Sequence, residues 1–91
     1  MTFVRSTPLL IEAMPQDGYT VRVRFEDGTS ADVDLSYLTG YGGVFAPLRD
    51  PAFFRQLRAD HDAGTIVWPN DADIAPETLY AHAQQSATTT A

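Results

Sequence analysis

Apolar and polar residues alternate most clearly between residues 19 and 35 of this chain. Tyr19 to Phe25 has an aromatic or β-branched residue at every second position, which predicts a strand with one buried face. Thr29 to Leu35 repeats the alternation, and an apolar run from Pro8 to Met14 predicts a strand before them. These segments together predict an antiparallel sheet built from hairpins.

The turn between the second and third of these strands contains Asp27-Gly28, a strong hairpin signal. Directly opposite residues of an antiparallel pair share a face, so a two-residue loop would set apolar Val23 opposite Asp32. A three-residue loop, residues 26–28, pairs like with like: Tyr19 with Leu35, Val21 with Val33, Val23 with Ala31 and Arg22 with Asp32. We therefore predict the longer loop, with Gly28 in the left-handed region that glycine adopts without a Cβ clash.

The chain is irregular from Ser36 to Leu48, where glycines interrupt scattered apolar residues. Asp50 and Pro51 then mark the start of a helix, as N-cap and first helical residue. Residues 50–61 leave two interpretations open, because their apolar residues fit either one helix or a short helix followed by a strand over Gln56–Asp60.

A short apolar run, Thr65 to Trp68, follows a turn and predicts a strand. If Gln56–Asp60 is its partner, a four-residue loop pairs Leu57 with Trp68 and Ala59 with Ile66. A last short helix is expected to start near Pro76 and to bury Leu79 and Tyr80. The polar run Gln84–Ala91 predicts a disordered tail behind a single domain of residues 1–83. The sequence thus predicts an α+β domain, a small antiparallel sheet of about five short strands packed with two short helices.

The composition excludes several kinds of chemistry. The chain has no cysteine and no lysine, which removes disulfides, thiolate ligands, a Schiff-base nucleophile and a phosphate-binding lysine. The net charge of −6 is evenly spread without a basic stripe, so direct nucleic-acid binding is not expected. An acidic surface suits a basic protein partner. The N-terminal apolar run fits neither a signal peptide nor a membrane span, which predicts a cytoplasmic protein that does not enter a membrane.

No motif predicts a metal or cofactor site. Asp71, Asp73 and Glu77 are the only acidic cluster, and a calcium loop starting at Asp71 lacks both the required glycine and the final glutamate. His61 and His82 stand alone, without metal-ligand spacing. We therefore expect neither a metal nor a cofactor.

Two groups of residues are candidates for binding a partner. Arg22, Arg24 and Arg58 could share one sheet face as an anion patch, although interleaved acids favour mutual neutralisation. Trp68, Pro69 and Asn70 form the second group, since an exposed tryptophan is typical of binding hot spots whereas a buried one belongs to the core. Whether Trp68 is exposed stays open at this point.

The chain also resembles a bacterial family of uncharacterised small α+β domains, the domain of unknown function 2442. The resemblance spans residues 8–80 and is carried by these elements: Val21–Gly28, Val33–Leu35, Phe45, Leu48–Asp50, Phe53–Phe54, Gly64–Asn70, Asp73–Ile74, Pro76–Glu77 and Leu79–Tyr80. Asp71 departs from the family, which more often has glycine there. The resemblance implies a strand after Phe54, no known activity and, in some relatives, an antitoxin-like pairing with a neighbouring small protein.

Two functional hypotheses follow from these observations. The first is a non-catalytic protein-interaction module, an antitoxin-like partner of a small basic protein that uses an exposed strand edge or the Trp68-Pro69 segment. The second is a small enzyme of unknown reaction whose acid–base work is done by Asp60, His61 or Asp71. The missing nucleophile and phosphate loop favour the first hypothesis.

Overall fold

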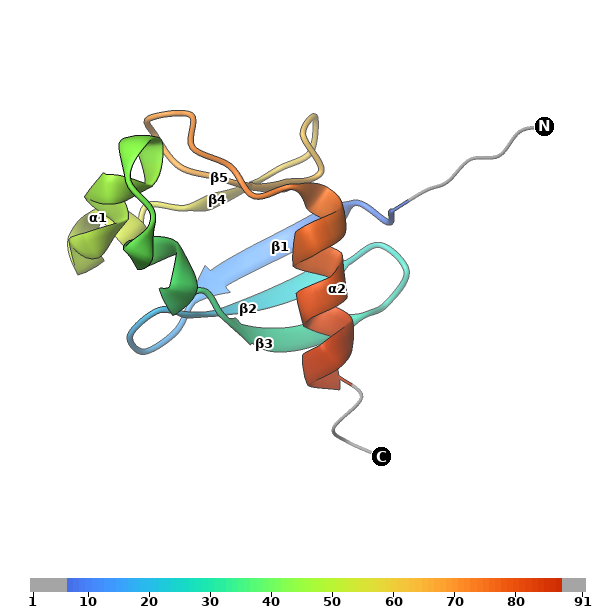
Figure 1. The fold of residues 1–91 in the computed structure, drawn as a ribbon. Coiled ribbons are helices and arrows are strands. Elements are labelled where there is room, and N and C mark those ends of the chain that lie inside the picture. Colours follow the sequence, from blue (N-terminus) through green and yellow to red (C-terminus); the bar gives the residue numbers. More distant parts are fainter. Residues whose placement is uncertain (1–6, 88–91) are drawn as a thin grey trace.

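Five strands form two antiparallel sheets in the computed structural model, which describes residues 7–87 (Figure 1). The strands are β1 (Leu10–Pro15), β2 (Thr20–Phe25), β3 (Ser30–Asp34), β4 (Arg58–Asp60) and β5 (Thr65–Val67). The first sheet has the order β1-β2-β3, and the second is the β4-β5 hairpin. β4 lies beside β1, which places the second sheet next to the first. The predicted α+β architecture is confirmed.

The register of the β2-β3 hairpin is the predicted one. Val21 lies opposite Val33, Arg22 opposite Asp32 and Val23 opposite Ala31. The loop has three residues, and Gly28 closes it at a φ of 91°. The prediction is correct because only this pairing keeps the apolar side chains of both strands on one face.

The irregular middle of the chain forms short helical segments at one end of the strands. They are η1 (Ser36–Gly40), η2 (Gly43–Arg49) and α1 (Pro51–Phe54), the first two being 3-10 helices. Asp50 caps α1 as predicted, because its Oδ1 accepts a hydrogen bond from the Ala52 amide at 3.0 Å. α1 ends after one turn, so the structure decides for a short helix followed by a strand.

The strand after α1 is shorter than predicted. The amides of Gln56 and Leu57 donate to the carbonyls of Phe53 and Phe54, which keeps both residues in the turn that ends α1. β4 consequently starts at Arg58, and no pairing of Leu57 with Trp68 occurs within the strands. The predicted pairing of Ala59 with Ile66 is present.

The last helix, α2 (Pro76–Ala87), is longer than the sequence analysis expects. Leu79 and Ala83, four residues apart on one helix face, are completely buried. Gln84 donates to the Tyr80 hydroxyl at 3.3 Å one turn back. The helix therefore continues through residues 84–87, where we predicted a disordered tail, and the rest of that tail lies outside the described residues.

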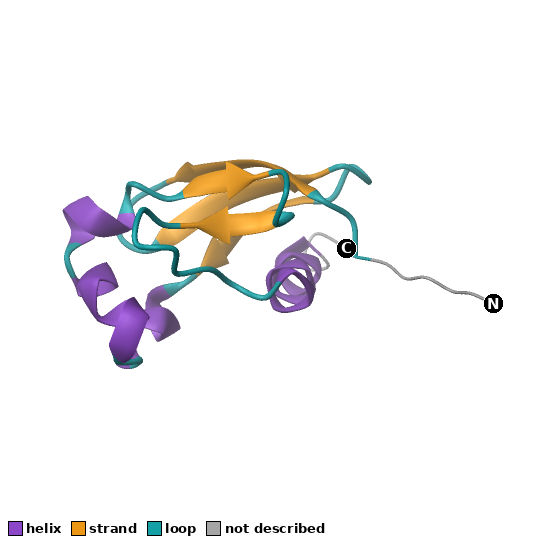
Figure 2. Ribbon diagram, turned by 90° about the horizontal axis from the view of Figure 1, so that it is seen from above, coloured by secondary structure: helices purple, strands orange, loops and turns teal. Residues whose placement is uncertain are grey.

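All helical segments lie on one side of the strands or at their end (Figure 2). α2 crosses that side and packs mainly against β3. The core between the layers consists of Leu10, Val21, Val23, Phe25, Val33, Leu35, Leu38, Leu48, Phe54, Leu57, Ile66, Trp68, Ala72, Ile74, Leu79 and Ala83. The opposite face of the sheet carries no helix within residues 7–87.

Candidate partner-binding edge

The three residues of the enzyme hypothesis do not form one site. Asp60 ends β4 and His61 follows it in the hairpin turn, whereas Asp71 lies beyond the other end of β5. The pKa of Asp60 is lowered, first because the Ala63 amide donates to its carboxylate and also because of Asp62 and Arg58. Such a carboxylate is a weak base, and its hydrogen bonds are those of a turn.

The acidic cluster near α2 has a structural explanation. Among residues 7–87, no group of three or more potential ligands is placed to hold a metal ion. Asp71 adopts a φ of 69°, the left-handed conformation that glycine prefers. That conformation agrees with the glycine that the family resemblance implies at this position. Asp71 thus serves the turn that follows Trp68.

Trp68 is completely buried, with 0% of its surface exposed. Its Nε1 donates to the Phe54 carbonyl at 2.9 Å, and its ring packs against the Phe54 ring at a centroid distance of 5.8 Å. Trp68 therefore belongs to the core, and its place among the candidate partner-binding residues is corrected. Pro69 and Asn70 beside it are exposed.

Asn70 also holds two parts of the fold together. Its Nδ2 donates to the Val44 carbonyl at 2.9 Å, and its Oδ1 accepts from the Ala72 amide at 3.2 Å. The first bond ties the turn after β5 to η2, and the second lies within that turn. The Pro69-Asn70 segment is exposed, and Asn70 stabilises the turn through these hydrogen bonds.

The three candidate arginines are each paired with a nearby acid. The distances are 3.0 Å for Arg22 to Asp32, 3.2 Å for Arg24 to Glu12 and 3.3 Å for Arg58 to Asp60. All six side chains are at least a quarter exposed, so each pair contributes about 0–1 kcal/mol to stability. The arginines thus form neutral pairs, as the interleaved acids indicate, and no concentrated anion patch.

One outer strand of the fold, β5, is covered along its free side. The Trp68 amide donates to the Ala72 carbonyl at 2.9 Å, and the Ile74 amide donates to the Ile66 carbonyl at 3.3 Å. Val67 also forms an isolated bridge with Asp73. Residues 72–74 therefore occupy the backbone positions that another strand would use.

The other outer strand, β3, has an open edge, because no further strand among residues 7–87 pairs with it. The Phe25 amide donates to Thr29, and the Leu35 amide donates to Tyr19, so the odd-numbered residues of this segment face β2. Bonded and non-bonded pairs alternate along an antiparallel ladder. The backbone N–H and C=O groups of Ser30, Asp32 and Asp34 therefore point away from β2. The sequence analysis expects an exposed strand edge without assigning it, because which outer strand is covered depends on the tertiary position of residues 72–74.

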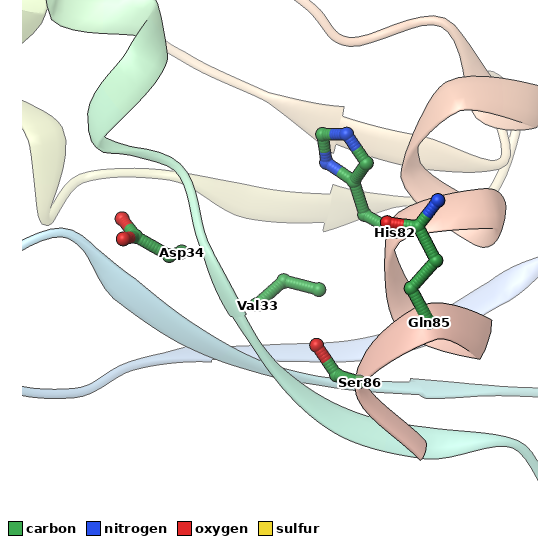
Figure 3. A pocket seen from close by; sticks show the side chains of 5 residues that line it. All are labelled: Val33, Asp34, His82, Gln85 and Ser86. Carbon is green, nitrogen blue, oxygen red and sulfur yellow. The ribbon is translucent and has the colours of Figure 1, made fainter. Parts of the chain in front are cut away.

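A groove runs beside this open edge. It has a volume of about 210 Å³ and is lined by Val33, Asp34, His82, Gln85 and Ser86 (Figure 3). The last three residues lie on α2, which extends beyond β3 at its C-terminal end (Figure 1). Most small-molecule sites enclose roughly 300–1,000 Å³, so this groove suits a side chain better than a substrate.

The walls of the groove are held in place by neighbouring groups. The His82 ring packs edge-on against the Tyr37 ring at a centroid distance of 5.2 Å. Asp34 Oδ1 accepts from the Ser36 amide at 2.9 Å, and this bond is the first cause of its lowered pKa. Asp34 thus remains ionised at neutral pH beside the open edge. It has no ion-pair partner among the described residues.

Sequence reasoning missed the groove because it ended the ordered chain at Ala83. Leu79 and Ala83 are spaced by four residues, and Ala87 continues that spacing. Extending the helical pattern by one turn would have placed Gln85 and Ser86 on α2. The groove would still have needed the helix position over β3, which only the tertiary structure supplies.

The fold is that of a small α+β domain, and within residues 7–87 one edge of its first sheet is not paired with another strand. A family model described as protein of unknown function (DUF2442) matches residues 10–85. The chain therefore belongs to this family, and the resemblance in the strand and turn motifs is confirmed. Searches of curated proteins and of solved structures found no match. Across residues 7–87, no helix has the length and apolar character needed to cross a membrane.

Proposed function

We propose that this domain is a non-catalytic interaction module that binds an extended, basic segment of a partner protein along the free edge of β3. One observation carries the proposal. The edge exposes backbone donors and acceptors at three residues, and α2 projects over the space where a further strand would lie. Strand addition of this kind derives affinity from main-chain hydrogen bonds.

The charge of the domain supports a basic partner. The net charge is −6, and the edge strand contributes Asp32 and Asp34. Complementary charge accelerates association and excludes partners of the same sign. We propose in particular an antitoxin-like pairing with a small basic protein encoded beside this one, in agreement with the pairing that the family resemblance suggests.

Titration calorimetry of the small basic neighbouring protein with this domain tests the proposal. Ser30→Pro removes a backbone N–H that points away from β2, and it leaves the net charge of the domain unchanged. Proline is tolerated at such a position, because the N–H has no partner in the sheet. We expect Ser30→Pro to weaken binding at least about tenfold, or 1.4 kcal/mol, and Ser30→Ala to leave it nearly unchanged. Melting temperatures of both variants verify that they fold.

Salt provides a second test of the same complex. Exposed charges separated by more than a Debye length, about 10 Å at 0.1 M salt, are screened, so affinity should fall as ionic strength rises. Equal affinity of the wild-type and Ser30→Pro proteins would place the partner elsewhere. Turnover of a small molecule that is lost in His61→Ala would refute the interaction role and restore the enzyme hypothesis.

A further inference from the structure

A strand added to β3 would have two faces with different surroundings. Its side chains must alternate between the face of the sheet that carries no helix and the face beneath α2. Within β3 itself, the side chains of Ser30, Asp32 and Asp34 lie on the face without a helix, which we call the outward side. The Val33 side chain lies on the face beneath α2, which we call the inward side. The same two surroundings continue past the edge, where the added strand would lie.

The outward side of this position is acidic. Asp32 is already paired with Arg22 at 3.0 Å, while Asp34 has no ion pair among residues 7–87. Asp34 is exposed, and Ser36 holds its carboxylate in place, since the Ser36 amide donates to Oδ1. A basic side chain on the outward side of an added strand would thus meet a fixed, ionised carboxylate.

The inward side is different in charge. Figure 3 shows Val33 on the β3 side of the groove, facing α2, with His82, Gln85 and Ser86 on the helix. The Asp34 side chain extends away from the three helix residues in this view. No other carboxylate lines the groove. A cation placed between Val33 and α2 would be partly desolvated, and the Asp34 carboxylate extends away from that position, which makes it unfavourable for a charge.

We infer that the β3 edge recognises a segment in which basic and uncharged residues alternate, with the basic side chains on the outward side beside Asp34. The inference rests on the proposed function and adds the sequence pattern of the ligand. Alternation is the feature that separates it from attraction between an acidic protein and any basic peptide. In a segment that carries the same charge as one block, some basic side chains would lie on the inward side and some uncharged ones on the outward side.

Two synthetic peptides of identical composition test this inference. One is Arg-Thr-Arg-Thr-Arg-Thr, and the other is Arg-Arg-Arg-Thr-Thr-Thr. Both carry blocked ends and a fluorescent label, and their binding to the full chain is followed by anisotropy. We expect the alternating peptide to bind at least about fivefold more tightly. A copy of it with N-methyl groups at every second residue should lose binding, because its strand-pairing donors are gone.

Charge variants locate the basic side chains. Asp34→Asn preserves an oxygen for the Ser36 amide and removes the negative charge. It should therefore lower the affinity for the alternating peptide about three- to tenfold. Asp71→Asn removes the same charge beyond the far end of β5, in a turn conformation that asparagine tolerates, and should change affinity less than about twofold. Equal effects of the two variants would overturn the assignment to Asp34.

The outcomes separate the inference from the function beneath it. Equal affinity for both peptides, with both weakened by Ser30→Pro, would refute alternation and leave edge binding intact. Failure of both peptides to bind, or binding insensitive to Ser30→Pro and to N-methylation of the peptide, would refute edge binding and the inference together. Preference for the alternating peptide with sensitivity to all three changes is the result we expect.

Discussion

Replacing Trp68 by phenylalanine tests the assignment of this residue to the core. The change removes the Nε1 donor and two ring carbons from a side chain with no exposed surface. The Phe54 carbonyl that accepts from Nε1 also accepts from the Leu57 amide at 3.2 Å. It therefore keeps one donor in the variant, and the loss corresponds to one ordinary hydrogen bond, about 0.5–1.5 kcal/mol.

Lost packing adds to this value. Two buried carbons at about 0.8 kcal/mol each give roughly 1.6 kcal/mol, and incomplete collapse around the smaller ring increases it. We therefore expect Trp68→Phe to lower the free energy of unfolding by about 2–3.5 kcal/mol. For a domain of this size each kcal/mol shifts the melting temperature by about 4–8 °C, so the variant should melt roughly 8–28 °C lower.

Urea unfolding followed by far-UV circular dichroism measures this loss, since Trp68 is the only tryptophan and its fluorescence disappears with it. Tyr41→Phe is the matched control, because that ring is half exposed and should change stability by less than about 0.5 kcal/mol. A loss below about 1 kcal/mol for Trp68→Phe would refute the packing described around it. It would also restore Trp68 as a candidate for contact with a partner.

Four further predictions concern stability. Gly28→Ala should cost about 1–2 kcal/mol in urea unfolding, because a Cβ is strained at its φ of 91° although it meets no atom within 4 Å. Gly64→Ala should cost a similar amount in the same assay, because its φ is 71° and the Leu9 methyl group 2.8 Å from the added Cβ belongs to an exposed side chain that can move aside. The folded-state pKa values of Asp27, Asp34 and Asp60 lie below the usual 3.8, chiefly because of hydrogen bonds from Tyr80, Ser36 and Ala63 respectively. The unfolded chain therefore binds more protons than the folded chain as the pH falls through about 4. Urea unfolding at a series of pH values should show a free energy of unfolding that keeps this contribution above that pH and loses it below. Treatment with a chelator should leave the melting temperature unchanged, and a shift of several degrees on adding a divalent ion would contradict this expectation.

Strands and helix starts could be predicted from the sequence where the pattern of residues was compatible with only one structure. Alternation along β2 and β3 allowed only one register, and Asp50-Pro51 marked the start of α1. The extent of β4 could not be derived in this way. Its start depends on two turn hydrogen bonds behind α1, which compete with strand pairing over only two residues.

The exposure of Trp68 was undecidable from the sequence for a related reason. A tryptophan beside Pro69-Asn70 fits both a core and a surface position. The structure buries it because α1 brings the Phe54 carbonyl within 2.9 Å of Nε1, a contact across 14 residues. Unlike strand pairing, a single contact between a side chain and a distant carbonyl leaves no repeating pattern in the sequence.

The open edge of β3 raises the question of why two copies of the domain should not pair there. Antiparallel pairing of two β3 strands centred on Asp32 would set Asp32 opposite its own copy and Ser30 opposite Asp34. Like charges directly opposite one another are destabilising, and charged residues on edge strands oppose such pairing in natural sheets. The acids on which the proposed binding of a basic segment depends therefore also disfavour self-association of this edge. Residues 72–74 protect β5 by a different means, direct backbone pairing, so under our proposal the strand protected by charge is the one that binds a partner of opposite charge.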